Sequence, residues 1–253
     1  MIDNSKERFT NRVDDYVKYR PGYPSVVVDF VHEHGVLPAA PVADIGAGTG
    51  ISTKLFLDAG HPVCAVEPNE AMRTACDRWL GGTAGYRSLA GNAEDTLLPE
   101  AGVDLVVAAQ AFHWFDVERA KKEFKRILRG DKMVALFWNS RSLDGSQFLR
   151  DYEALLRRYG TDYEQVAERY SGDEVIEAWF GKGNVQNARF PNGQTLPFDG
   201  LKGRLLSSSY APGQGHPQYE PMLAALRQIF DEQQKDGVVV FEYETRLYLG
   251  RLN

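Results

Sequence analysis

The sequence predicts an α/β fold in which a mostly parallel sheet is covered by helices on both faces. Through residues 1–141, short apolar runs typical of buried strands alternate with amphipathic segments typical of helices. Such alternation implies right-handed crossovers between parallel strands. Near the end of the chain, residues 238–249 place Val239, Phe241, Tyr243, Leu247 and Leu249 on one face of a strand and Glu242, Glu244 and Arg246 on the other, which indicates a long strand. Together these patterns predict a parallel sheet closed by an antiparallel pair.

The expected elements begin or end at local signals. Gly35, Gly60, Gly81 and Gly130 follow expected helices, and Asn69 stands where it can cap one. The predicted helices and strands of the first part, in chain order, are helix 25–34, strand 42–45, helix 51–59, strand 63–66, helix 70–80, strand 86–89, strand 103–109, helix 117–129 and strand 133–138.

The stretch that follows is rich in aromatic residues at helical spacing, from Phe148 through Tyr163. It is either a helical pack that buries its own aromatic stripe, or a lid over the carboxyl ends of the strands that excludes water from a reaction. We favour the lid. We expect three divisions: a core over 1–141, the helical insertion over 142–183 and the rest of the core over 184–253. The last division is expected to hold strands at 184–190 and 238–249 and a helix at 221–232.

The first predicted strand ends at Asp44 and is followed by a turn with glycine at every second position, Gly46, Gly48 and Gly50. Alternate glycines let a ligand lie against the main chain, and the next helix directs its free N–H groups at the same turn. A dinucleotide fingerprint needs its third glycine one position later than Gly50, so the spacing disfavours that class. Glu67 follows the second strand about 20 residues after Gly46, where a carboxylate can accept both hydroxyls of a ribose.

The Asp-x-Gly-x-Gly-x-Gly pattern, with Glu67 in register, resembles the class I S-adenosylmethionine-dependent methyltransferases. The Tyr-x-x-Tyr-Arg-Pro segment that begins at Tyr16 resembles a subgroup related to ubiquinone/menaquinone and trans-aconitate methyltransferases. The resemblance implies a Rossmann-like sheet of seven mostly parallel strands with a terminal antiparallel hairpin. It also implies S-adenosylmethionine as the cofactor and S-adenosylhomocysteine as its product.

The same resemblance implies the site residues. The segment around Asn92 matches the family's adenine-binding segment, and Arg20 is a candidate partner for the cofactor's carboxylate. Cofactor contacts are expected from Tyr19, Arg20, Asp44, Gly46, Ala47, Gly48, Thr49, Gly50, Glu67, Pro68, Met72, Asn92, Ala93, Glu94, Gln110 and Ala111, and the acceptor pocket is expected to include Tyr16, Phe112 and Trp114.

His113 is the candidate catalytic residue, because it follows the fourth predicted strand among aromatic side chains. It is either a general base or part of the pocket wall, and we favour the wall. A base helps only if the acceptor is protonated at working pH, whereas holding the reactants in line helps in every case. The expected reaction is transfer of a methyl group to a small molecule, with a carboxylate or hydroxyl oxygen favoured as the attacking atom.

Two other functions stay open at this point. A cofactor-binding protein without catalysis would carry the same glycine turn. A nicotinamide-dependent oxidoreductase fits the ribose acid but not the glycine spacing, and the sequence has no Tyr-x-x-x-Lys pair. Binding of S-adenosylhomocysteine but not NAD would exclude the oxidoreductase.

The composition of the sequence limits the classes of binding partner that we expect. The net charge of −6 disfavours a nucleic-acid surface, and no run approaches the ~20 apolar residues of a membrane span. The histidines and the two cysteines show no metal-ligand spacing, so no metal is expected, and the cysteines are expected to be reduced core thiols. We therefore expect a cytoplasmic monomer or homodimer whose partner is a small-molecule substrate.

Overall fold

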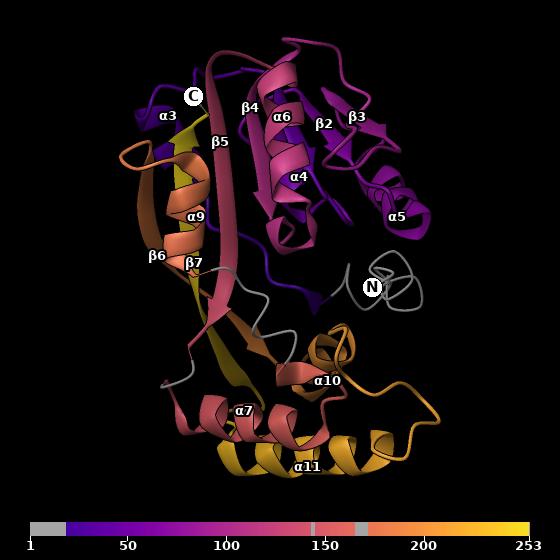
Figure 1. Ribbon diagram of the computed structural model, residues 1–253. Helices are drawn as coiled ribbons and strands as arrows, with labels where there is room; N and C mark the ends of the chain where they lie inside the picture. The colour runs from indigo at the N-terminus through magenta and orange to yellow at the C-terminus, as the bar shows by residue number, and fades with distance from the viewer. Residues whose placement is uncertain (1–18, 143–144, 165–171, 253) are drawn as a thin grey trace.

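The computed structural model describes residues 19–142, 145–164 and 172–252, and its centre is a seven-stranded sheet. The strand order is β3-β2-β1-β4-β5-β7-β6. The first five strands of this order are parallel, and β7 runs antiparallel to both of its neighbours. The predicted fold class, with its terminal antiparallel pair, is confirmed (Figure 1).

The elements match the predicted order closely. The strands are β1 (Val42–Ile45), β2 (Val63–Val66), β3 (Tyr86–Leu89), β4 (Val103–Ala109), β5 (Leu128–Arg141), β6 (Val185–Leu196) and β7 (Val239–Arg251). The helices are α3 (Val26–Glu33), α4 (Ile51–Asp58), α5 (Glu70–Leu80), the short 3-10 helix η2 (Phe112–Trp114), α6 (Val117–Ile127), α7 (Gln147–Tyr159), α9 (Asp173–Phe180), α10 (Phe198–Leu206) and α11 (Tyr219–Gln233).

Local chemistry explains where the helices begin. Asn69 caps α5 as predicted, because its side-chain oxygen accepts a hydrogen bond of 3.0 Å from the N–H of Met72. Asp116 caps α6 in the same way, accepting from the N–H of Arg119 at 3.1 Å. The helix was predicted to extend to residue 129, but α6 ends at Ile127. Leu128 instead pairs with Val103 as the start of β5.

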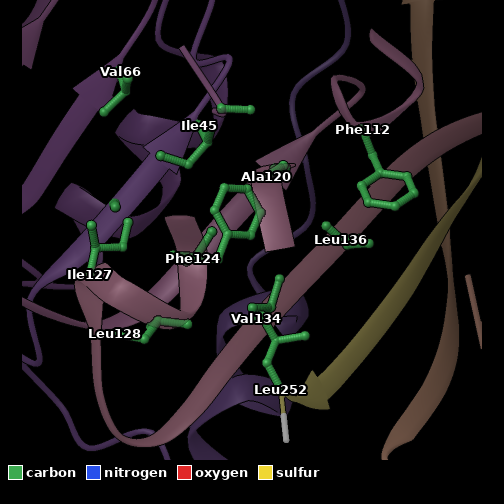
Figure 2. Packing of buried hydrophobic residues seen from close by; sticks show 14 of the residues in the cluster. Ile45, Val66, Phe112, Ala120, Phe124, Ile127, Leu128, Val134, Leu136 and Leu252 are labelled. Atoms are coloured by element: carbon green, nitrogen blue, oxygen red, sulfur yellow. The ribbon is translucent and has the colours of Figure 1, made fainter. Parts of the chain in front are cut away.

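Two hydrophobic cores lie on opposite faces of the sheet. One face is covered by α3, α4 and α5, and the other by α6, α9 and η2. Figure 2 shows the second core, where Phe124 and Ile127 of α6 pack over the strand residues Ile45 and Val134. Because helices cover both faces of the sheet, the side chains on both faces of these strands are buried. This explains the continuous apolar runs in the sequence.

A third core holds α7, α10 and α11 together against the outer halves of β6 and β7. We call these three helices the cap; it lies beyond the carboxyl ends of β4 and β5, at the bottom of Figure 1. The helices of the predicted insertion therefore do not pack together: α7 belongs to the cap, whereas α9 packs on the sheet. Helices α10 and α11, from the stretch assigned to the rest of the core, complete the cap. Whether the cap acts as a lid stays a prediction.

No helix within 19–142, 145–164 or 172–252 combines the length and apolar character needed to cross a membrane. Over the same ranges, no group of three or more His, Cys, Asp or Glu side chains is placed to hold a metal ion.

A histidine pair at the amino edge of the sheet makes stability depend on pH. His61 is buried, its Nδ1 lies 2.9 Å from the carbonyl oxygen of Ala40, and its Nε2 lies 2.8 Å from Nε2 of His32. A carbonyl only accepts, so Nδ1 of His61 carries a proton and its Nε2 accepts from His32. Burial lowers the pKa of His61.

The neutral form of His61 is therefore favoured by folding. Its contribution to stability is complete above the ordinary histidine pKa of about 6.5 and is lost as the pH falls through the lowered pKa. We expect the thermal unfolding midpoint to fall on acidification over this window, and the fall to be smaller in His61→Asn. Parallel pH profiles for the two proteins would show that His61 is not responsible.

Candidate functional site

The turn after β1 uses its three glycines in two different ways. All three adopt positive φ: 71° at Gly46, 57° at Gly48 and 95° at Gly50. A Cβ on Gly46 would stand 2.6 Å from Cβ of Ala111, and one on Gly50 would stand 2.6 Å from Sγ of Cys76. A Cβ on Gly48 would meet nothing within 4 Å. Two glycines thus let the turn pack closely, and the middle one leaves open space beside the main chain.

Asp44 lies directly beneath this turn and is completely buried. Its Oδ2 accepts hydrogen bonds from the hydroxyls of Ser52 at 2.7 Å and Thr53 at 2.6 Å, both in the first turns of α4. Burial raises its pKa to about 6, against the opposing effect of these two bonds. Its Oδ1 and the hydroxyl of Thr49 are buried without a hydrogen-bond partner among the described residues. Buried polar atoms are normally satisfied, so both atoms fit a site for a polar ligand.

Glu67 is held in place by backbone N–H groups from two sides of the turn. Oε2 accepts from the N–H of Gly48 at 2.9 Å, and Oε1 accepts from the N–H of Asn69 at 2.7 Å. Burial raises the pKa of Glu67 in spite of these two bonds. Each oxygen keeps a further lone pair, so the carboxylate is oriented and can still accept two hydroxyl groups.

The residues that follow Glu67 support it. Pro68 is half-buried, and Met72 is buried, with its N–H used in the α5 cap. Arg73, which the sequence did not suggest, donates to the carbonyl oxygen of Glu67 at 2.8 Å.

The predicted adenine segment forms a tight turn after β3. Asn92 Oδ1 accepts from the N–H groups of Glu94 at 3.0 Å and Asp95 at 2.8 Å, and Ala93 is buried. The carboxylate of Glu94 accepts from the N–H of Asp116 at 2.8 Å, which ties the turn to the start of α6. The side-chain oxygens of Asn92 and Glu94 thus have roles in shaping this loop, and adenine recognition there stays a prediction.

The loop after β4 brings Gln110 and Ala111 to the glycine turn. Gln110 has a φ of 57°, and its N–H donates to the carbonyl oxygen of Phe137 at 3.0 Å. Its side-chain Nε2 donates to the carbonyl oxygen of Asn139 at 3.3 Å, and its Oε1 is buried without a partner among the described residues. Non-glycine residues at positive φ concentrate at functional sites.

The aromatic run of η2 divides between the core and the site wall. Phe112 is 1% exposed, and its ring packs edge-on against Trp179 at 5.0 Å, so it supports the wall from behind and does not line a pocket. His113 and Trp114 are both partly exposed, and their ring centroids are 4.7 Å apart. These two side chains can face an acceptor.

The N-terminal segment reaches the cap. Arg20 Nη2 donates to the carbonyl oxygen of Ser207 at 2.9 Å, at the end of α10. The ring of Tyr19 covers Gly203 so closely that a Cβ there would overlap it. Arg20 is therefore placed at the cap, and pairing with the cofactor's carboxylate stays a prediction. Tyr16 lies outside the described residues.

Ser52, Thr53 and Arg73 were not predicted from the sequence. Arg141 and Arg204, on the side of the cap, were not predicted either. Ser52 and Thr53 follow the glycine turn directly, so their position at the start of α4 was the available signal for hydrogen bonding to Asp44.

Comparisons with known proteins show that this chain is similar to methyltransferases. Residues 43–136 match the family model "Methyltransferase domain". An uncharacterized methyltransferase of Mycobacterium tuberculosis is 38% identical over 135 residues, which are 53% of this chain and 52% of that protein. A candidate S-adenosylmethionine-dependent methyltransferase of Saccharomyces cerevisiae is 30% identical over 128 residues, 49% of this chain and 43% of that protein. The chain spans about half the length of these curated relatives.

A solved structure described as a candidate type II methyltransferase from Anaeromyxobacter dehalogenans has the same fold. The two superpose with a TM-score of 0.70 at 23% identity, covering 92% of this chain and 98% of the other. The strand order and the glycine turn with its two acids are both consistent with the matching family model. Residues 43–136 are therefore a methyltransferase domain, and the chain has the fold of a solved methyltransferase structure.

Proposed function

We propose that this protein transfers a methyl group from S-adenosylmethionine to a small molecule, with a carboxylate or hydroxyl oxygen as the attacking atom. The observation that carries the proposal is the open space at Gly48, flanked by the oriented carboxylate of Glu67 and the unsatisfied Oδ1 of Asp44. The chemistry of this donor and acceptor set fits the cofactor. Glu67 can accept from ribose hydroxyls, and the negative charge of Asp44 favours a cationic ligand.

Bound beside the glycine turn and Glu67, S-adenosylmethionine would supply an activated methyl group on a sulfonium sulfur for displacement by an acceptor oxygen. The protein's own contribution is alignment, which can account for effective molarities of about 10⁵–10⁸ M. Glu67 and the glycine turn fix one partner, and the wall formed by His113 and Trp114 is placed to fix the other. The cap, which lies beyond the same strand ends, is placed to exclude water.

Two measurements test this function. Calorimetry with S-adenosylhomocysteine and with NAD separates a methyltransferase from an oxidoreductase, and only the first ligand is expected to bind. Release of labelled methyl from S-adenosylmethionine to a panel of small acids and alcohols then separates an enzyme from a regulatory protein that only binds the cofactor. Binding without transfer to any compound would favour the regulatory protein.

We expect His113 to act mainly as pocket wall. A carboxylate acceptor is already ionised at neutral pH, so no proton needs to be removed. His113→Ala should therefore weaken acceptor binding, seen as a raised KM, with a small change in kcat and an unchanged pH profile. A loss of about 10²–10⁴ in kcat with an altered pH profile would instead identify a general base.

A further inference from the structure

Two buried arginines lie at the junction of the cap and the sheet, apart from the predicted cofactor site. Arg141 is the last residue of β5, and Arg204 is on α10. Both arginines lie near Tyr152 and Tyr210, and Arg141 also contacts one acid. We call this group the arginine–tyrosine cluster: Arg141, Tyr152, Glu153, Tyr163, Arg204 and Tyr210.

Arg141 is only partly satisfied. Its side chain is 10% exposed and its guanidinium lies over the ring of Tyr152, 5.4 Å from the centroid. Nη2 donates to the carboxylate of Glu153 and to the hydroxyl of Tyr163, the latter at 2.7 Å. Nε is buried and has no hydrogen-bond partner in the described part of the chain, and the same is true of the hydroxyl of Tyr152, which is completely buried.

Arg204 is buried more deeply and has no acid beside it. Nε donates to the hydroxyl of Tyr243 at 3.0 Å, and Nη1 donates to the hydroxyl of Ser208 at 3.1 Å. The guanidinium lies 5.5 Å from the ring centroid of Phe241. Within the described ranges no carboxylate comes within 4.0 Å of it. Buried charges are normally paired, because an unpaired one loses its hydration without compensation.

The charges of the cluster therefore do not balance. Glu153 is the one acid that forms an ion pair with these two arginines among the described residues, and it also accepts from Arg157 at 2.9 Å. The same positive charge acts on Tyr210: burial raises its pKa, but Arg204 and Arg141, a hydrogen bond with Ser208 and the charge of Arg20 together hold it below the ordinary value. The cluster has unused donors and a positive potential, which are the features of an anion site.

We propose that Arg141 and Arg204 bind an anionic group of the methyl acceptor, a carboxylate of a small organic acid. The planar guanidinium matches a carboxylate in bidentate geometry. Arg141 ends β5 and Arg204 is on α10 of the cap, so an acceptor held between them by one end can present its other end to the sheet side; Figure 1 shows β5 and α10. This inference rests on the proposed function for the identity of the ligand as acceptor.

The test is equilibrium binding to the full chain saturated with S-adenosylhomocysteine. Acetate, succinate, benzoate and citrate are each compared with the corresponding amide by calorimetry, and inorganic phosphate is a further arm. At least one carboxylate should bind roughly tenfold or more tightly than its amide. Arg204→Met should weaken that carboxylate by roughly ten- to hundredfold, Arg204→Lys by less, and neither should change the affinity for S-adenosylhomocysteine.

Arg157→Met is the matched control, because Arg157 bonds to the same Glu153 but is 57% exposed; it should leave carboxylate binding unchanged. The unliganded Arg204→Met protein should unfold at a midpoint no lower than that of the wild type, since it no longer buries an unpaired charge. A much lower midpoint would identify Arg204 as a structural residue and overturn the proposal. So would equal binding of acids and amides, or tighter binding of phosphate than of any carboxylate. If S-adenosylhomocysteine itself does not bind, the proposed function fails as well.

Discussion

Gly48→Ala is expected to weaken S-adenosylhomocysteine binding by roughly a hundredfold or more, about 3 kcal/mol, while the protein remains folded. The Cβ of alanine would enter the open space where the cofactor is proposed to lie against the main chain. The added side chain meets no protein atom within 4 Å, so the cost to the fold is the positive φ alone, about 1–2 kcal/mol.

Gly130→Ala provides a matched control for this variant. Gly130 has a φ of 56°, close to the 57° of Gly48, and its Cβ would also meet nothing within 4 Å. Both variants should lose the same small amount of stability, and calorimetry should find the affinity lowered only in Gly48→Ala. Equal affinities in the two folded variants would remove the basis for placing the cofactor at this turn.

Asp44→Asn is expected to stabilise the unliganded protein by about 3 kcal/mol at pH 7, the free energy that corresponds to a pKa raised from 3.8 to about 6. The folded state favours the protonated acid, so its contribution to stability is complete below pH 3.8 and is lost as the pH rises through about 6. Asparagine is neutral throughout and keeps an oxygen to accept from Ser52 and Thr53. The variant should at the same time bind S-adenosylhomocysteine less tightly, by about 1.5–3 kcal/mol, if Asp44 bonds to the ligand as an anion.

Denaturant unfolding of the wild type and Asp44→Asn between about pH 4 and 7 measures this difference directly, because the contributions of other groups cancel. The gap should open as the pH rises and then level off. Asp58→Asn is a suitable control, since Asp58 forms only an exposed pair with Lys54 and should change stability by less than about 0.5 kcal/mol. A less stable Asp44→Asn at pH 7 would show that its two hydroxyl bonds outweigh the burial of its charge.

The features that the sequence predicted correctly are local. The glycine turn and the N-cap at Asn69 are each specified within a few residues, so spacing alone was sufficient for them, whereas the role of Glu67 as the ribose acid stays a prediction. Helix α10 was not predicted, because Gly200 and Gly203 weaken its pattern. The helix packs into the third core through Leu201 and Leu205, and Gly203 leaves room for the ring of Tyr19, distant in sequence, directly on the helix.

The arginine–tyrosine cluster shows why the acceptor side was harder to predict. Arg141, Tyr152 and Arg204 come from a strand and two helices that meet only in the folded protein. In the sequence each arginine has the appearance of an ordinary surface charge, and nothing nearby marks it as buried. Phe112 shows the same difficulty: its position next to His113 suggested either a pocket residue or a core residue, and only tertiary packing shows that the side chain is buried.

The length of β7 has a consequence for how the molecule unfolds. Its first half, including Val239 and Phe241, belongs to the core of the cap, and its second half, including Leu247 and Leu249, belongs to the core beneath α3 and α4. One uninterrupted strand thus carries side chains of all three cores, since Tyr248 belongs to the core on the other face of the sheet, and β6 pairs with it along its length. Cap and sheet should therefore lose their structure in a single cooperative transition, with amide hydrogens protected to a similar degree at both ends of β7. Any opening that admits the acceptor is then expected to come from small movements of individual helices, because the paired strands β6 and β7 join the cap to the sheet without interruption.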